Sequence, residues 1–240
     1  MEELKISGKL RNSLQQFIRG LKDIYQEELV SIILYGSAAS GEFIEKHSNL
    51  NLLVVLENTN LENLKKAARF INKFRIINPL FLTEDYIKWS TDIFPIEFLD
   101  MQENRLVLYG KDILKDVNID MRNLRFQCEQ ELKAKLISLK QLFLRINRHK
   151  TALRYLLLRS IISILHILRN ALRLKGKKPP YKKDEILKEL AVEFQIDTGV
   201  WKKILAAKNK QIKLRNRDIE NLFVNFVSEL EKIIDIVDRL

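Results

Sequence analysis

Cysteine, proline and glycine are scarce in this 240-residue sequence, which has 1 Cys, 4 Pro and 7 Gly. A single cysteine, Cys128, excludes a disulfide framework within the chain. So few Pro and Gly residues argue against long disordered stretches, and a 46% share of hydrophobic residues is enough to build a core. The first residues contain no apolar run of the kind that directs secretion, so we expect a cytoplasmic protein.

Long uncharged apolar runs are also lacking, and a membrane span needs about 20 mostly apolar residues. The most apolar segment, residues 152–174, contains four arginines, and its longest uncharged piece is residues 160–168. We therefore interpret this segment as a buried helix of a bundle and expect no membrane partner.

The first half of the sequence alternates apolar runs with amphipathic stretches. Short apolar runs predict strands at Leu29–Tyr35, Leu50–Leu56, 79–82 and 96–99. Helices are predicted over 8–26, over 61–74 behind a Thr59-x-x-Glu62 capping box, and over 83–89. Strands that alternate with helices indicate an α/β or α+β domain with a mixed sheet.

The pattern changes after about residue 115, where long amphipathic helices follow one another. Apolar residues recur at steps of four and three between residues 124 and 146. Further helices are predicted over 151–174, 184–194, 198–208 and 218–240. Such a series is typical of an antiparallel helical bundle. We therefore predict two domains, residues 1–117 and 118–240.

Charge is distributed unevenly between the two halves. Residues 1–120 contain 15 Lys and Arg against 18 Asp and Glu, whereas residues 121–240 contain 27 against 13. Residues 202–217 include seven Lys and Arg and no acidic residue. The basic half favours RNA or another anionic partner, although a solvated basic surface is the alternative. No base-reading pattern accompanies these charges.

The most informative motif follows the first predicted strand. Leu34-Tyr35-Gly36-Ser37-Ala38 is followed, after a gap, by Ser48-Asn49-Leu50-Asn51 at the start of the second strand. Glycine lets the backbone approach a ligand closely, and the N–H groups of a helix N-terminus favour phosphate. Gly36 and Ser37 are therefore candidate nucleotide-binding residues.

These residues resemble the nucleotidyltransferase superfamily of DNA polymerase β type, and especially the aminoglycoside adenylyltransferases. The resemblance implies a nucleotidyltransferase-type sheet domain that binds ATP with Mg²⁺, followed by the helical domain. It also implies two metal-holding aspartates at the positions that Asn49 and Asn51 occupy here. Amides carry no charge and are poorer ligands for this hard cation, so both metal positions are degenerate.

A third carboxylate is expected from the same resemblance. These adenylyltransferases carry a glutamate on a later strand as general base, and Glu97, in the predicted strand 96–99, is our candidate. Its alternative interpretation is an exposed carboxylate on an edge strand.

Three functions stay open from the sequence. The first is a nucleotidyltransferase-fold protein that has lost most of its catalysis and needs no cofactor. The second is an active enzyme that uses Mg²⁺ and ATP, with the metal held by Glu97 and water. The third is an RNA-binding module that works through the basic bundle.

Overall fold

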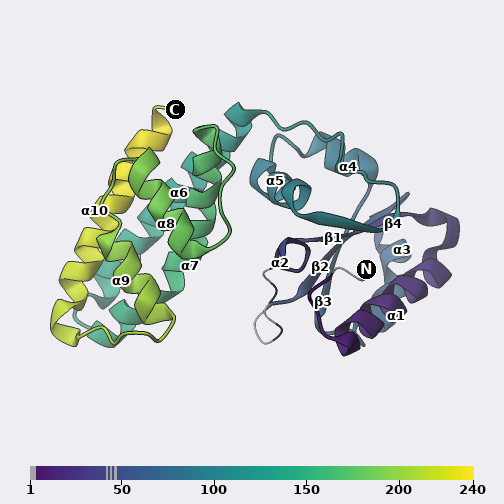
Figure 1. Ribbon diagram of the computed structural model, residues 1–240, viewed down its shortest axis with the longest axis horizontal. Coiled ribbons are helices and arrows are strands. Elements are labelled where there is room, and N and C mark those ends of the chain that lie inside the picture. The colour runs from purple at the N-terminus through teal and green to yellow at the C-terminus, as the bar shows by residue number, and fades with distance from the viewer. Residues whose placement is uncertain (1–3, 42, 44, 46–47) are drawn as a thin grey trace. The chain divides into compact units, whose positions relative to one another are not determined.

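A four-stranded mixed sheet forms the centre of the N-terminal half (Figure 1). Its order is β3-β2-β1-β4, with β1 at Leu29–Tyr35, β2 at Leu50–Leu56, β3 at Ile77–Leu82 and β4 at Arg105–Gly110. β1 runs antiparallel to β2 and β4, and β2 runs parallel to β3. The strands β2, β3 and β4 therefore all begin at the end of the sheet where β1 finishes. We call this end of the strands the edge of the sheet.

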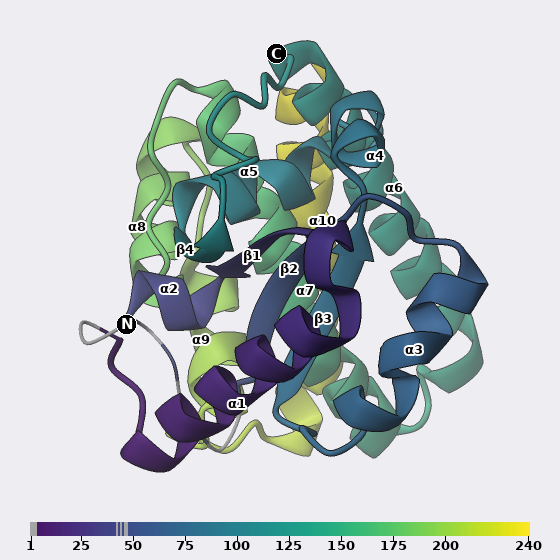
Figure 2. The same ribbon diagram turned by 90° about the vertical axis from the view of Figure 1, so that its right-hand side faces the viewer.

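One face of this sheet is covered by α1 (Gly8–Tyr25) and α3 (Leu61–Ile71), and Figure 2 shows α1 lying across it. Leu14, Phe17 and Leu21 of α1 are fully buried against it, because they recur at helical spacing. Burial of each such side chain contributes about 1.5–3 kcal/mol. This apolar packing supports the sheet behind the edge where β2, β3 and β4 begin.

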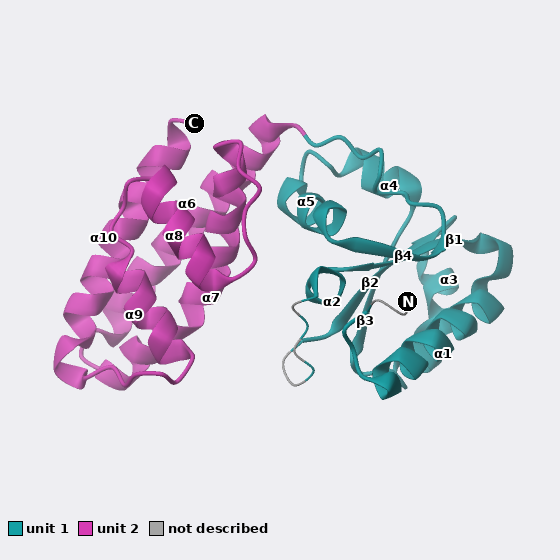
Figure 3. Ribbon diagram, viewed as in Figure 1, with its two compact units in different colours: residues 1–119 teal, residues 120–240 magenta. Residues whose placement is uncertain are grey.

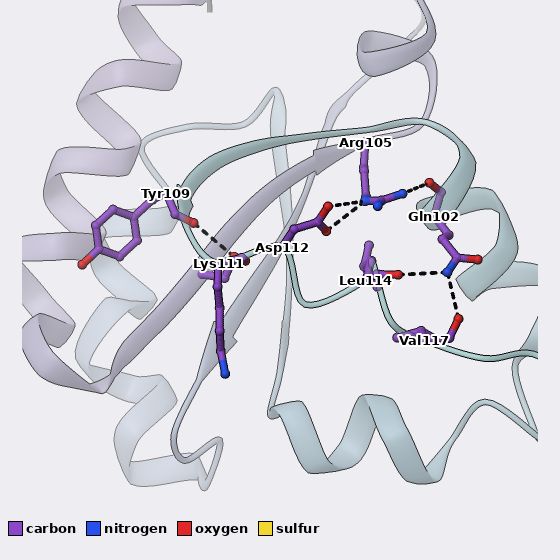
Figure 4. Close-up of polar contacts among 8 residues, drawn as sticks. Gln102, Arg105, Tyr109, Lys111, Asp112, Leu114 and Val117 are labelled. Carbon is purple, nitrogen blue, oxygen red and sulfur yellow. Dashed lines mark hydrogen bonds and ion pairs between the residues drawn. The ribbon is translucent and has the colours of Figure 1, made fainter.

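The opposite face is covered by α4 (Glu84–Trp89), by α5 (Pro95–Glu103) and by the segment after β4. Figure 4 shows how that segment is held. Gln102 Nε2 donates to the carbonyls of Leu114 and Val117, at 2.9 and 2.8 Å, and Arg105 pairs with Asp112. These hydrogen bonds and this ion pair hold the segment after β4 in place before the helical half begins.

The predicted strand at 96–99 is wrong, because these residues lie inside α5. Pro95 occupies the first turn of that helix, where its missing N–H is not needed and its fixed φ suits a helix. The fourth strand is instead β4, which sequence analysis did not identify.

The N-terminus of α3 also differs from the prediction. The cap is Asn60 and not Thr59: the Asn60 side chain accepts a hydrogen bond from the Asn63 N–H at 2.8 Å. The Asn60 N–H in turn donates to Asn58 Oδ1 at 2.8 Å.

We expect Asn60→Ala to lower the free energy of unfolding by about 1 kcal/mol, because one helix N–H loses its acceptor. Thr59→Ala is the matched control and should cost less than about 0.5 kcal/mol, as surface substitutions generally do. Urea unfolding followed by circular dichroism measures both changes. Equal losses in the two variants would contradict the assignment of the cap.

The structure, a computed structural model, describes residues 4–41, 43, 45 and 48–240, and divides into two compact units, Met1–Ile119 and Asp120–Leu240 (Figure 3). The second unit consists of helices only. They are α6 (Met121–Ile146), α7 (Lys150–Leu174), α8 (Lys183–Glu193), α9 (Gly199–Lys208) and α10 (Ile219–Asp238). The predicted fold class, a mixed-sheet α/β domain followed by a helical bundle, is confirmed.

The helix α7 is the core helix of the second unit and packs against α6, α8, α9 and α10. Because α7 contacts other helices on several sides, apolar residues occupy most of its surface. By length and composition alone α7 could also cross a membrane, and it is the one helix of that kind within the ranges that the structure describes.

Candidate functional site

The Gly36-Ser37 turn forms where β1 ends and the short helix α2 (Ser37–Ser40) begins. Gly36 has a φ of 76°, a conformation that glycine adopts without the strain a Cβ would bring. Its carbonyl accepts hydrogen bonds from the N–H groups of Ala39 and Ser40, both at 3.0 Å. The N–H groups of Ser37 and Ala38 have no acceptor among the residues described, so they remain available to a ligand.

Asn51 lies directly beside this turn, on β2 and opposite Tyr35 of β1. A Cβ added to Gly36 would come within 3.4 Å of Asn51 Nδ2, which shows how closely the turn and the amide approach. Asn49 precedes β2 and is exposed. The turn and Asn51, two features that the sequence singled out, therefore meet at one edge of the sheet.

A third asparagine at this edge, Asn78, was not singled out from the sequence. It stands on β3 in register with Asn51, and its Nδ2 donates to Asn51 Oδ1 at 3.3 Å. The prediction began the third strand at Pro79, one residue too late to include it. Pro79 is tolerated in β3 because β3 is an edge strand, where one side makes no ladder hydrogen bonds. The available signal was the apolar pair Ile76-Ile77 directly before Asn78, which extends the apolar run toward the N-terminus.

The pairing register extends this edge into a row across all four strands. Asn78, Asn51, Tyr35 and Arg105 stand side by side, and directly paired residues project from the same face of a sheet. Burial raises the pKa of the Tyr35 hydroxyl above its ordinary value, which keeps the phenol neutral. The row therefore contains two amides, one phenol and one guanidinium, and no carboxylate.

The charge of Arg105 in this row is already compensated. Its Nε lies 2.9 and 3.0 Å from the two carboxylate oxygens of Asp112, and the side chains are 21% and 29% exposed. A second nitrogen of Arg105 donates to the Gln102 carbonyl. Arg105 thus fixes the loop after β4, and it is not a free cation at the edge (Figure 4).

Glu97 does not lie on a strand as expected. It is exposed in the first turn of α5. Its predicted place on a strand, from which we inferred a role as general base, is therefore corrected. The two strands that follow β2, which are β3 and β4, carry no carboxylate at any position. A base on a later strand is therefore not available in this sheet.

The donor set at the edge does not fit a Mg²⁺ site. Asn49 and Asn51 are neutral, and the Asn51 oxygen already accepts the Asn78 amide. Mg²⁺ usually relies on carboxylates to compensate the cost of removing its water. Within the described ranges no three His, Cys, Asp or Glu side chains come together in a way that could hold a metal ion.

Comparison with known proteins supports the fold. The sequence matches no protein-family model and no curated protein. Among solved structures, the chain is similar to spectinomycin adenyltransferase AAD(9) from Enterococcus faecialis, solved with ATP and spectinomycin. The two are 13% identical, the match covers 90% of this chain and 99% of that one, and the TM-score is 0.56. The chain therefore has the nucleotidyltransferase fold of adenylyltransferases, a sheet domain followed by helices.

Proposed function

We propose that this chain is a cytoplasmic nucleotidyltransferase-fold protein that has lost nucleotidyl transfer and keeps a weak, metal-independent phosphate-binding turn. The observation that carries the proposal is the Asn51–Asn78 amide pair beside Gly36. It stands where the resemblance places a Mg²⁺ site.

Loss of the metal-binding carboxylates removes the group that would position the metal ion, and this ion provides a main part of the catalysis. Phosphoryl transfer depends on positioning and on metal ions that neutralise the developing charge. Two neutral amides at positions 49 and 51 remove about two negative charges from the metal site. Position 78 adds a third amide next to them. We therefore expect transfer activity to lie orders of magnitude below that of an enzyme with the acidic residues.

Residual nucleotide binding would depend on the turn itself. The unpaired N–H groups of Ser37 and Ala38 and the Ser37 hydroxyl can donate to a phosphate oxygen. Without a metal ion the charge of the triphosphate stays uncompensated at this edge. Binding to the natural protein should then be weak and should not improve when Mg²⁺ is added.

Calorimetric titration of ATP, with and without Mg²⁺, tests the proposal on the full chain. The natural protein is compared with the Asn49→Asp/Asn51→Asp variant and with Asn12→Asp/Asn72→Asp, which adds the same charge at exposed positions elsewhere in the unit. We expect Mg²⁺-dependent binding of ATP in the first variant only.

Two outcomes of this titration would count against the proposal. Natural protein that binds Mg²⁺ and ATP as tightly as the Asn49→Asp/Asn51→Asp variant would show that other groups hold the metal. Turnover of ATP with Mg²⁺ by the natural protein at about 1 per second or faster, a rate typical of enzymes, would contradict the loss of catalysis.

A further inference from the structure

A second candidate site lies in the helical unit, between the first turns of α7 and the segment that joins α9 to α10. It is a pocket of about 600 Å³. Three cationic residues line it, Arg154, Lys210 and Lys213, together with Asn216 and with four apolar residues, the largest of which are Leu158, Ile212 and Leu214. Its volume is in the range of pockets that bind small molecules, roughly 300–1,000 Å³.

Arg154 presents an incompletely paired guanidinium at this pocket. One terminal nitrogen donates to Asn216 Oδ1, whereas Nε is buried and has no hydrogen-bond partner among the residues described. Buried donors are nearly always paired in native proteins, and an unpaired one costs about 1–3 kcal/mol. A phosphate that draws the guanidinium toward the pocket would give Nε an acceptor and remove this cost. A phosphate oxygen suits a guanidinium because the two can form parallel hydrogen bonds.

Lys210 and Lys213 also lack anionic partners. Neither makes an ion pair with a carboxylate in the described part of the chain, unlike Lys133 and Lys140 of the same unit, which pair with Glu129 and Glu231. Lys210 has a φ of 61°, so the turn after α9 adopts a left-handed conformation at this residue. The pocket is therefore a concentration of uncompensated positive charge.

The positive charge continues beyond the pocket along the chain. Residues 202–217 contain seven Lys and Arg and no acidic residue. Lys208 and Arg215, which flank the pocket in sequence, are exposed and form no ion pair within the ranges that the structure describes. A ligand with several phosphates in a row would contact more of this charge than a single nucleotide could.

We infer that this pocket binds the backbone of a single-stranded nucleic acid. The three cations contact successive phosphates, and the apolar floor of Leu158, Ile212 and Leu214 accepts a base or ribose. The amide oxygen of Asn216 in the lining already accepts the Arg154 guanidinium, and the apolar residues carry no side-chain hydrogen-bonding group, so we expect binding that does not depend on sequence. The site lies in the helical unit and is independent of the function proposed for the sheet domain.

Fluorescence anisotropy with a labelled 12-nucleotide uridine RNA, titrated between 50 and 200 mM KCl, tests the inference. Each phosphate contact on a single strand contributes about −0.7 to the slope of log K against log salt, so three contacts contribute about −2. The variant Arg154→Gln/Lys210→Gln/Lys213→Gln should lose this contribution. The slope at which its affinity falls with salt should therefore be less steep by about 2.

The control removes the same charge from exposed lysines outside the pocket, as Lys178→Gln/Lys183→Gln/Lys188→Gln. Its slope of log K against log salt should differ from that of the natural protein by no more than about 0.7, the contribution of one phosphate contact. Circular dichroism checks that both variants are folded. Arg154→Lys keeps the charge and loses the planar fork, so it should weaken binding while leaving the slope of the salt titration close to that of the natural protein.

Three other outcomes would overturn the inference, and one further result is expected if it is right. Equal losses in the pocket variant and the control would overturn it, because overall charge would then hold the RNA. No RNA binding at 100 mM KCl, or ATP binding that depends on the three pocket residues in the absence of RNA binding, would also overturn it. The Asn49→Asp/Asn51→Asp variant should bind the RNA as the natural protein does, which keeps this test separate from that of the sheet domain.

Discussion

Replacing Gly110 with alanine is expected to lower the free energy of unfolding of the sheet domain by about 3 kcal/mol. Gly110 ends β4 with a φ of 72°, a conformation that costs other residues about 1–2 kcal/mol. A Cβ at this position would lie 2.0 Å from the Val30 carbonyl oxygen, a backbone atom that no side-chain rotation can move. Overpacking of this kind adds about 1–3 kcal/mol.

The clash cannot be relieved by a simple shift of β4. The Ser31 hydroxyl hydrogen-bonds to the carbonyls on both sides of Gly110, at 3.1 Å to Tyr109 and 2.7 Å to Lys111. β4 is therefore held close to β1 at the point where the added carbon would enter. The last ladder contacts between the two strands would have to open.

Gly41→Ala is the control, because Gly41 has a φ of 80° in the same unit and no described atom within 4 Å of an added Cβ. It should show the backbone cost alone, about 1–2 kcal/mol. Urea unfolding of both variants measures the difference. Similar losses for the two substitutions would mean that the backbone around Val30 yields, and that the close approach of β1 and β4 is not required for stability.

Two strands could be predicted from the sequence with their observed bounds. β1 and β2 are short apolar runs bounded by polar or glycine residues, and their burial on both sides of the sheet accounts for this pattern. β4 was missed because residues 96–99 were assigned to the fourth strand. The tripeptide Leu-Tyr-Gly occurs at the C-terminal end of both strands, because β1 ends at Tyr35 directly before Gly36 and β4 ends at Gly110, and this repeat was the signal available in the sequence.

The candidate site was only partly predictable for a different reason. Gly36, Ser37 and Asn51 belong to one local motif, so sequence spacing alone could bring them together. Asn78 is 27 residues further along the chain than Asn51, and its place depends on the register of two parallel strands. Register is set by the burial of whole strands against the helices, which a single short motif does not specify.

The conversion of residues 49, 51 and 78 from asparagine to aspartate is expected to make the stability of the sheet domain depend on Mg²⁺. Without metal, three carboxylates at this edge repel one another, and the Asn51–Asn78 hydrogen bond is lost. With 10 mM Mg²⁺ and a dissociation constant of about 1 mM, the triple variant gains about 1.4 kcal/mol of stability through binding. The natural protein, whose edge is neutral, should show no such gain.

Urea unfolding with and without 10 mM Mg²⁺, at matched ionic strength, measures the effect apart from any catalysis. The Asn49→Asp/Asn51→Asp variant is the informative comparison, because it leaves Asn78 in place. If position 78 belongs to the same edge in solution, the triple variant should respond to Mg²⁺ more strongly than the double variant does. An equal response would remove Asn78 from the site.

A gain in the natural protein as large as in the triple variant would show that amides suffice to hold the metal. The loss of the carboxylates would then no longer explain a loss of catalysis.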